Sequence, residues 1–295
     1  MPEIDLRQEI IRFSRLCYER RLLVAMDGNL SARLPSGDVV CTRGMVHKGF
    51  LADSDLLVVD MEGRKKRGEG APTSEIFMHL ACYRARPDVH AVIHAHPPLC
   101  VALTIAGVGM DRFVLPEVVL TLGTIPTVPY ETTGTQALAD EVGTHMRDYD
   151  AILMDTHGAV TVGRSVLEAF CRMETLEHTA LIMKTAHEMG GIRSLPEEEA
   201  IHLRRMGLER YGGPPSAVAR KDEPAASLPI DRPAPIPAFA DLRLARLTNR
   251  PLRTLQGPPD TPPPIDRPDP AAARQAALAS LVVDEVVRDL AERNA

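Results

Sequence analysis

Residues 89–96 read VHAVIHAH, and this stretch decides the class of fold and where a functional site is expected. A short, mostly apolar run of this kind predicts a buried β-strand. Alternate side chains of a strand point to the same face, so His94 and His96 are expected to face one metal ion together. The pattern therefore predicts a strand that carries two metal ligands at its end.

A third ligand is predicted at His157, which follows the apolar strand AILMD (151–155). Gly158 comes next and lets the backbone pass close to a neighbour. Three imidazoles with a fourth position left for substrate make a catalytic zinc site. The chain has 10 histidines, and on spacing alone an ordinary surface or interior role stays open for each of the three.

Glu75, at the end of GAPTSE (70–75), is the candidate for proton transfer. The segment EIFMHLACYRAR (75–86) predicts a helix that Thr73 or Ser74 caps. A carboxylate in the first turn of a helix lies in the positive field of its N-terminus, which lowers the carboxylate pKa. A routine helix-start glutamate is the alternative interpretation.

Three short loops rich in backbone N–H, hydroxyl and amide groups are candidates for holding a phosphate. They contain Gly28 and Asn29, Arg43 and Gly44, and Thr73 and Ser74. Each pair is also an ordinary turn or cap sequence, so a purely structural role stays open.

Helix and strand patterns alternate along residues 1–212, which predicts one α/β domain. Apolar residues at helical spacing predict a helix over residues 5–23. Few helix breakers occur in residues 164–190, which predicts a long helix there. Strands are expected at 31–34 and 39–42.

Composition excludes several classes of protein. The net charge is −6, and the basic residues are scattered, so no nucleic-acid partner is expected. No apolar run reaches the roughly 20 residues that span a bilayer, and the N-terminus lacks a signal-peptide pattern. These features predict a cytoplasmic protein without a membrane partner. The five cysteines lack CxxC spacing and predict reduced, mostly buried thiols.

Prolines concentrate in the last third of the chain. Residues 213–270 have the composition of a Pro-rich disordered linker. Residues 271–295 contain no Gly or Pro, and their apolar residues recur at three-and-four spacing. That pattern predicts a C-terminal amphipathic helix.

Six motifs occur in the order and spacing of one known family. They are GNLSARL (28–34), VHKGFLADSDLLVVD (46–60), GAPTSE (70–75), RARPDVHAVIHAHP (84–97), VPYETTGT (128–135) and DTHGAVTVG (155–163). Together they resemble the class II aldolase/adducin family, in particular its L-fuculose-phosphate aldolases. The resemblance covers roughly residues 5–212.

The resemblance implies a three-layer αβα fold, with a mostly antiparallel sheet of nine strands flanked by helices. It also implies a homotetramer with one Zn²⁺ per subunit. By motif matching, the zinc ligands are His94, His96 and His157, and Glu75 is the residue that alternates between zinc ligand and catalytic base. The phosphate loops correspond to Gly28, Asn29, Gly44, Thr73 and Ser74.

The activity implied is the cleavage of a deoxyketose 1-phosphate, similar to L-fuculose 1-phosphate, into dihydroxyacetone phosphate and an aldehyde such as lactaldehyde. Methylthioribulose-1-phosphate dehydratase, pentulose-phosphate 4-epimerase and decarboxylase activities are alternatives on the same fold. A non-catalytic, adducin-like interaction module is another, although retention of the three histidines and Glu75 argues against it.

Two departures from the family pattern concern the substrate. In the family, the sequence of this phosphate loop usually resembles ITPSG. In this chain it reads VCTRG (40–44), which places Arg43 where a hydroxyl residue is usual. An arginine can grip a phosphate or a carboxylate with two parallel hydrogen bonds. The family's proton-donor tyrosine has no clear counterpart in DRFVLPE (111–117).

The C-terminal segment carries a second resemblance. A Pro-rich linker that ends in a short amphipathic helix resembles the encapsulation peptides that direct enzymes into bacterial microcompartments. This implies shell proteins as partners, bound by a helix-in-groove contact. A helix that packs back onto its own tetramer is the alternative.

Overall fold

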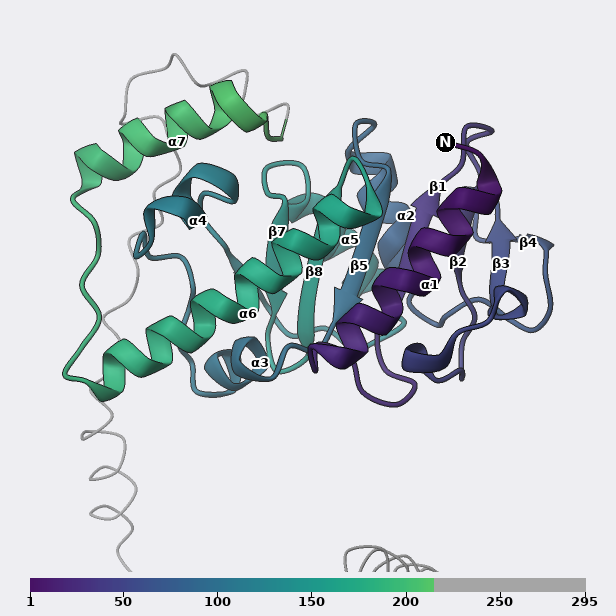
Figure 1. The fold of residues 1–295 in the computed structure, drawn as a ribbon, viewed down its shortest axis with the longest axis horizontal. Coiled ribbons are helices and arrows are strands. Elements are labelled where there is room, and N and C mark those ends of the chain that lie inside the picture. The colour runs from purple at the N-terminus through teal and green to yellow at the C-terminus, as the bar shows by residue number, and fades with distance from the viewer. Residues whose placement is uncertain (215–295) are drawn as a thin grey trace, which may run out of the picture. The chain divides into compact units, whose positions relative to one another are not determined.

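The apolar runs of the sequence form one sheet in the computed structural model, which describes residues 1–214 (Figure 1). The strands are β1 (Asn29–Arg33), β2 (Val39–Thr42), β3 (Leu56–Val59), β4 (Lys65–Arg67), β5 (Ala91–Ala95), β6 (Thr127–Val128), β7 (Ala151–Met154) and β8 (Gly158–Gly163). Their order across the sheet is β4-β3-β2-β1-β5-β8-β7-β6. Only β6 and β7 pair in parallel, and the other pairings are antiparallel.

The count of nine strands is corrected to eight within the described residues. Met110 and Ile125 lie opposite each other, but they form only an isolated bridge and no further strand. The sheet therefore ends at β6, which is two residues long.

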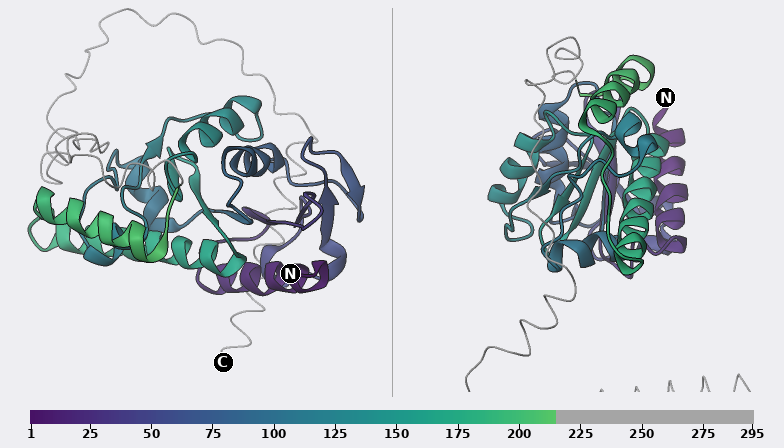
Figure 2. Two further views of the ribbon diagram at one scale, coloured as in Figure 1. Left: turned by 90° about the horizontal axis from the view of Figure 1, so that it is seen from above. Right: turned by 90° about the vertical axis from the view of Figure 1, so that its left-hand side faces the viewer.

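Helices cover both faces of the sheet, which confirms the expected α/β arrangement (Figure 2). They are α1 (Glu3–Glu19), α2 (Ile76–Ala85), α3 (Pro98–Ile105), α4 (Pro116–Thr121), α5 (Gln136–His145), α6 (Val166–Glu188) and α7 (Glu197–Tyr211), with short 3₁₀ turns η1 (Lys48–Phe50) and η2 (Asp53–Asp55). One buried core lies beneath α1 and α6, and a second lies beneath α2 and α5.

Strand β5 contributes to both cores because its side chains alternate between the faces of the sheet. Ala91, Ile93 and Ala95 belong to the core under α1 and α6, whereas Val92 belongs to the core under α2 and α5. By the same alternation His94 lies on the face of the sheet that α2 and α5 cover. The fold thus directs the first predicted metal ligand toward the start of α2.

The boundaries of the elements agree with the sequence patterns to within a few residues. The helix expected at 5–23 is α1, which ends earlier, at Glu19, and the helix expected at 164–190 is α6. The strand expected at 39–42 is β2. The expected cap of α2 is wrong: the helix begins at Ile76, and Glu75 rather than Thr73 or Ser74 holds the N-cap position.

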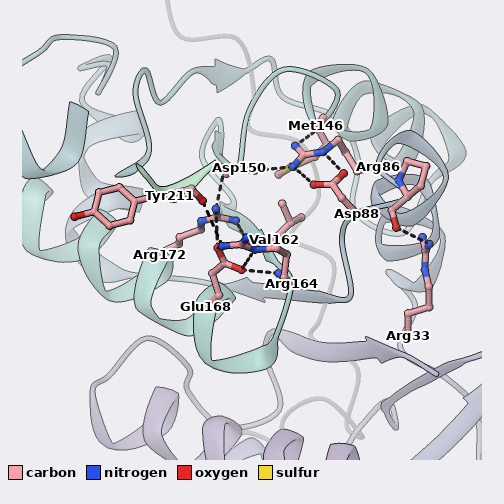
Figure 3. Close-up of polar contacts among 11 residues, drawn as sticks. Arg33, Arg86, Asp88, Met146, Asp150, Val162, Arg164, Glu168, Arg172 and Tyr211 are labelled. Carbon is pink, nitrogen blue, oxygen red and sulfur yellow. Dashed lines mark hydrogen bonds and ion pairs between the residues drawn. The ribbon is translucent and has the colours of Figure 1, made fainter. Parts of the chain in front are cut away.

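A buried ion cluster fastens the end of α2 to the sheet and to α6 (Figure 3). The Asp150 carboxylate, which is 1% exposed, forms ion pairs with Arg86 and with Arg172, each at 3.0 Å. Arg86 also pairs with Asp88 at 2.7 Å, and Arg172 pairs with Glu168 at 3.2 Å. Each buried charge is therefore balanced by a partner of opposite sign, as burial requires.

Among residues 1–214, no helix is long and apolar enough to cross a membrane. Cys171 is exposed and the other four cysteines are buried, all of them as free thiols. Beyond residue 214, the linker predicted up to residue 270 and the amphipathic helix predicted at 271–295 lie outside the described residues.

Candidate metal centre

His94, His96 and His157 lie together, although the first two end one strand and the third follows another. His94 belongs to β5, His96 comes directly after it, and His157 lies in the turn between β7 and β8. Their ligand nitrogens all lie within 4.8 Å of one another. The register that places Ala95 opposite Ala159 brings this turn to the end of β5.

The backbone of the neighbouring strand orients the His94 ring. Its Nδ1 donates to the carbonyl of Ala159 at 3.0 Å, which leaves Nε2 facing the cluster. Burial, and then the charges of His94 and His157, lower the pKa of His96 to about 3, so that ring is neutral at pH 7.

The three imidazoles fit a divalent metal. The Nε2 atoms of His94 and His96 are 3.1 Å apart, a distance at which two lone pairs repel unless a proton or a cation lies between them. Nδ1 of His157 is buried and has no hydrogen-bond partner among the described residues. Three imidazole nitrogens that converge in this way match the ligand set of catalytic zinc sites, which bind the metal through neutral histidines.

The Glu75 carboxylate completes the cluster from the start of α2. Its Oε2 lies 3.3 Å from Nε2 of His94, and its Oε1 lies 3.2 Å from Nε2 of His157. Burial opposes ionisation of this group, but the charge of His94 and hydrogen bonds from His157, His94 and Asn29 outweigh it. They hold the pKa of Glu75 well below its usual range, so the group is a carboxylate at neutral pH.

The predicted phosphate loops meet around Thr73. The Asn29 amide donates to Thr73 Oγ1 at 3.0 Å and to Glu75 Oε2 at 2.9 Å. The Gly44 N–H donates to the carbonyl of Ala71, next to the same segment. The structure therefore brings these loops close to Glu75, beside the predicted metal ligands, and the Asn29 side chain donates to Glu75.

The backbone at Gly28 is left-handed, with φ +69°. A Cβ at this position would lie 2.8 Å from the carbonyl oxygen of His94, so the loop before β1 approaches β5 closely. Only glycine allows both the backbone conformation and this approach.

Arg43 lies beside the predicted phosphate loops, where an ion pair fixes its side chain. Its Nη2 donates to Asp55 Oδ1 at 2.7 Å, and its side chain is 32% exposed. Its backbone forms a bridge with Pro72, next to Thr73. Ser74, in contrast, is exposed. Arg43 is thus fixed by an acidic partner close to the predicted phosphate loops.

Lys48 is a residue of this region that the sequence patterns did not indicate. Its side chain is buried, and Nζ donates to the carbonyls of Met26 and Val46, each at 2.9 Å. Burial lowers the pKa of Lys48 to about 8, although nearby acidic groups oppose the shift. The ammonium joins the loop before Gly28 to the loop after Gly44, a contact that no sequence spacing reveals.

Gly158 lets the chain pass between the ligands, as the sequence predicts. A Cβ there would lie 2.6 Å from the carbonyl oxygen of Ala95 and 2.7 Å from Cδ2 of His96. We expect Gly158→Ala to displace the imidazoles and to weaken zinc binding by roughly 10- to 100-fold. Competition with a chromophoric chelator measures the affinity. Gly143→Ala, in α5, is the control, and equal zinc affinity in both variants would contradict the expectation.

Comparison with known proteins gives consistent results. The family model for the class II aldolase and adducin N-terminal domain matches residues 8–183. An L-fuculose phosphate aldolase of Methanococcus vannielii is 34% identical over 60% of this chain and 94% of its own. A 3-oxo-tetronate 4-phosphate decarboxylase of Escherichia coli is 33% identical over 61% of this chain and 87% of its own. A solved L-fuculose 1-phosphate aldolase is 28% identical, with a TM-score of 0.65 over 69% of this chain and 96% of that one.

Proposed function

The chain belongs to the class II aldolase and adducin family, and on that premise we propose that it is a zinc-dependent aldolase that cleaves a deoxyketose 1-phosphate. The products are dihydroxyacetone phosphate and an aldehyde such as lactaldehyde. The relative in Methanococcus vannielii carries the name of such an aldolase. The observation that carries the proposal is the convergence of three histidines and Glu75 on one point.

His94, His96 and His157 would hold the zinc ion, with Glu75 beside them. Bound there, the ion supplies Lewis acidity that stabilises negative charge on a ketone oxygen of the substrate. The lowered pKa of His96 keeps that ring neutral, and the bond from Nδ1 of His94 to Ala159 turns its Nε2 toward the cluster, so both rings suit this role.

Glu75 moves the proton. When the C–C bond breaks, its electron pair passes to the ketone fragment, and the hydroxyl of the departing carbon gives up its proton as it becomes an aldehyde. The Glu75 carboxylate can take up that proton and, as a carboxylic acid, deliver it to the carbon that has lost its bond. Its contacts with His94 and His157 fix the two oxygens that exchange this proton.

The substrate phosphate is proposed to bind at the three loops that contain Gly28 and Asn29, Arg43 and Gly44, and Thr73 and Ser74. The bond from Asn29 to Thr73, the proximity of Gly44 to Ala71 and the bridge from Arg43 to Pro72 support this proposal, because they gather these residues beside Glu75.

Decarboxylation of a 3-oxo sugar-acid phosphate is the second candidate. It leaves the electron pair on the same ketone fragment but releases carbon dioxide in place of an aldehyde. Two observations favour it: the decarboxylase of Escherichia coli is as similar as the aldolases, and Arg43 offers a carboxylate a bidentate partner.

The first test is a substrate screen. The purified full chain is incubated with deoxyketose 1-phosphates, and dihydroxyacetone phosphate is trapped by a coupled reduction, while carbon dioxide release is followed with 3-oxo-tetronate 4-phosphate. Triose phosphate released from a deoxyketose 1-phosphate supports the aldolase. Carbon dioxide released from 3-oxo-tetronate 4-phosphate, which leaves the same triose phosphate, supports the decarboxylase if no deoxyketose 1-phosphate is cleaved. Full activity after removal of all divalent metal by a chelator would contradict both. Sedimentation of the same sample tests the expected homotetramer.

A further inference from the structure

A chain of buried hydrogen bonds leads from the middle of α2 to Glu75. The hydroxyl of Tyr83 lies 2.8 Å from Ser31 Oγ, which lies 2.7 Å from Nδ1 of His79. Nε2 of His79 bonds to Oδ1 of Asn29, and the Asn29 amide nitrogen lies 2.9 Å from Oε2 of Glu75. Ser31, His79 and Tyr83 are each 2% exposed or less.

The chemistry of the Glu75 carboxylate fixes the direction of every bond in this chain. An ionised carboxylate only accepts, so the NH₂ group of Asn29 faces Glu75 and its Oδ1 faces His79. That oxygen also only accepts, so His79 carries its proton on Nε2. Nδ1 of His79 then accepts from the Ser31 hydroxyl, and the Ser31 oxygen accepts from the Tyr83 hydroxyl.

Burial removes the alternatives to this arrangement. Burial first, and then the charge of His94, lower the pKa of His79 to about 3, which keeps the ring neutral. Burial also raises the pKa of Tyr83 above its usual range, so its hydroxyl keeps its proton. With one tautomer of His79 and one orientation of the Asn29 amide, every donor in the chain has an acceptor.

Loss of the His79 ring would remove the only partner that the structure gives, within the described residues, to Oδ1 of Asn29. An Asn29 amide without that partner can turn over and present its oxygen to Glu75, where the two acceptors repel. The Glu75 carboxylate would then lose the donor that holds it against His94 and His157.

We propose that His79 is a positioning residue of the reaction, which acts through Asn29 to hold the Glu75 carboxylate against the metal ligands. Ser31 and Tyr83 fix the tautomer of its ring. The inference rests on the proposed function, since it assigns the network a purpose in the proton transfer by Glu75. It also gives a reason for three polar side chains in the apolar layer between α2 and the sheet.

The test compares His79→Leu with His79→Gln in the zinc-loaded full chain. Leucine removes the donor to Asn29, so we expect kcat to fall roughly 10- to 100-fold while KM changes less than about threefold. Glutamine can place an amide N–H where Nε2 was, and it should restore kcat to within about fivefold of the unsubstituted enzyme. The bound zinc should stay stoichiometric in both variants.

Thr161→Val is the matched control, because it also removes one buried hydrogen bond, from Thr161 Oγ1 to the carbonyl of Ala169. It should retain the unsubstituted kcat. A His79→Leu variant with unsubstituted kcat, or a His79→Gln variant as slow as His79→Leu, would overturn the proposal.

A second measurement needs neither activity nor zinc, and it applies even if His79→Leu does not fold. In the unsubstituted chain labelled with ¹⁵N-histidine, the NMR signals of His79 should show a proton on Nε2 and none on Nδ1 between pH 5.5 and 8.5. A proton on Nδ1 would overturn the inference. Inactivity of the unsubstituted enzyme in the substrate screen would instead count against the proposed function, so the two failures are distinguishable.

Discussion

Glu75→Gln is expected to reduce kcat by roughly 10²- to 10⁴-fold while stoichiometric zinc stays bound. Glutamine keeps the size of the side chain and an oxygen that can accept from Asn29, as the carboxylate does at 2.9 Å. It cannot take up and return a proton. The three histidines that would hold the metal are unchanged, so the loss should fall on turnover.

The measurement combines steady-state kinetics with metal analysis of the same preparation. Glu62→Gln is the control, since Glu62 is exposed and pairs only at the surface, with Arg64. Unchanged turnover in Glu75→Gln would remove Glu75 from the mechanism. Loss of zinc together with turnover would make Glu75 a required ligand rather than the proton carrier.

Asp150→Ala is expected to lower the free energy of unfolding by about 3–5 kcal/mol, because it leaves two arginines without their shared buried partner. Arg86 is 4% exposed and Arg172 is 14% exposed, and each forms an ion pair with Asp150 at 3.0 Å (Figure 3). Alanine can accept from neither guanidinium, and water does not reach them as it does at the surface.

Urea denaturation of the full chain measures this change. Lys66→Ala serves as the control, because its ion pair with Asp38 is half-exposed and should contribute less than about 1 kcal/mol. A loss below about 1 kcal/mol for Asp150→Ala would show that the cluster does not stabilise the fold as its burial indicates.

The parts of the site that follow strand alternation could be predicted from the sequence. His94 and His96 are two residues apart at the end of an apolar run, and period two alone places them on one face. The proximity of His157 could not be derived in this way, because it depends on the pairing of β5 with β8 and on its register. Its place after the apolar run 151–155 made His157 a candidate ligand, and the resemblance to a family singled it out among the other histidines.

The hydrogen-bond network was missed for a physical reason. His79 and Tyr83 are four residues apart, so they lie on one face of α2, and that spacing was visible in the sequence. Whether such a face is exposed or packed on a sheet depends on tertiary contacts with β1, through Ser31 and Asn29. The prediction that Thr73 or Ser74 caps α2 was wrong for a related reason. Tertiary contacts decide this end of the helix: Thr73 accepts from Asn29, and Glu75 contacts His157.

The alternation of β5 between two cores also bears on how this protein can change over time. Ile93 and His94 are adjacent: Ile93 belongs to the apolar core, whereas His94 faces Glu75 in the proposed metal site. A single insertion or deletion within this strand would exchange their faces, burying an imidazole in the core and turning an isoleucine toward the substrate. Selection for a folded chain therefore preserves the placement of His94 even where activity itself is not under selection.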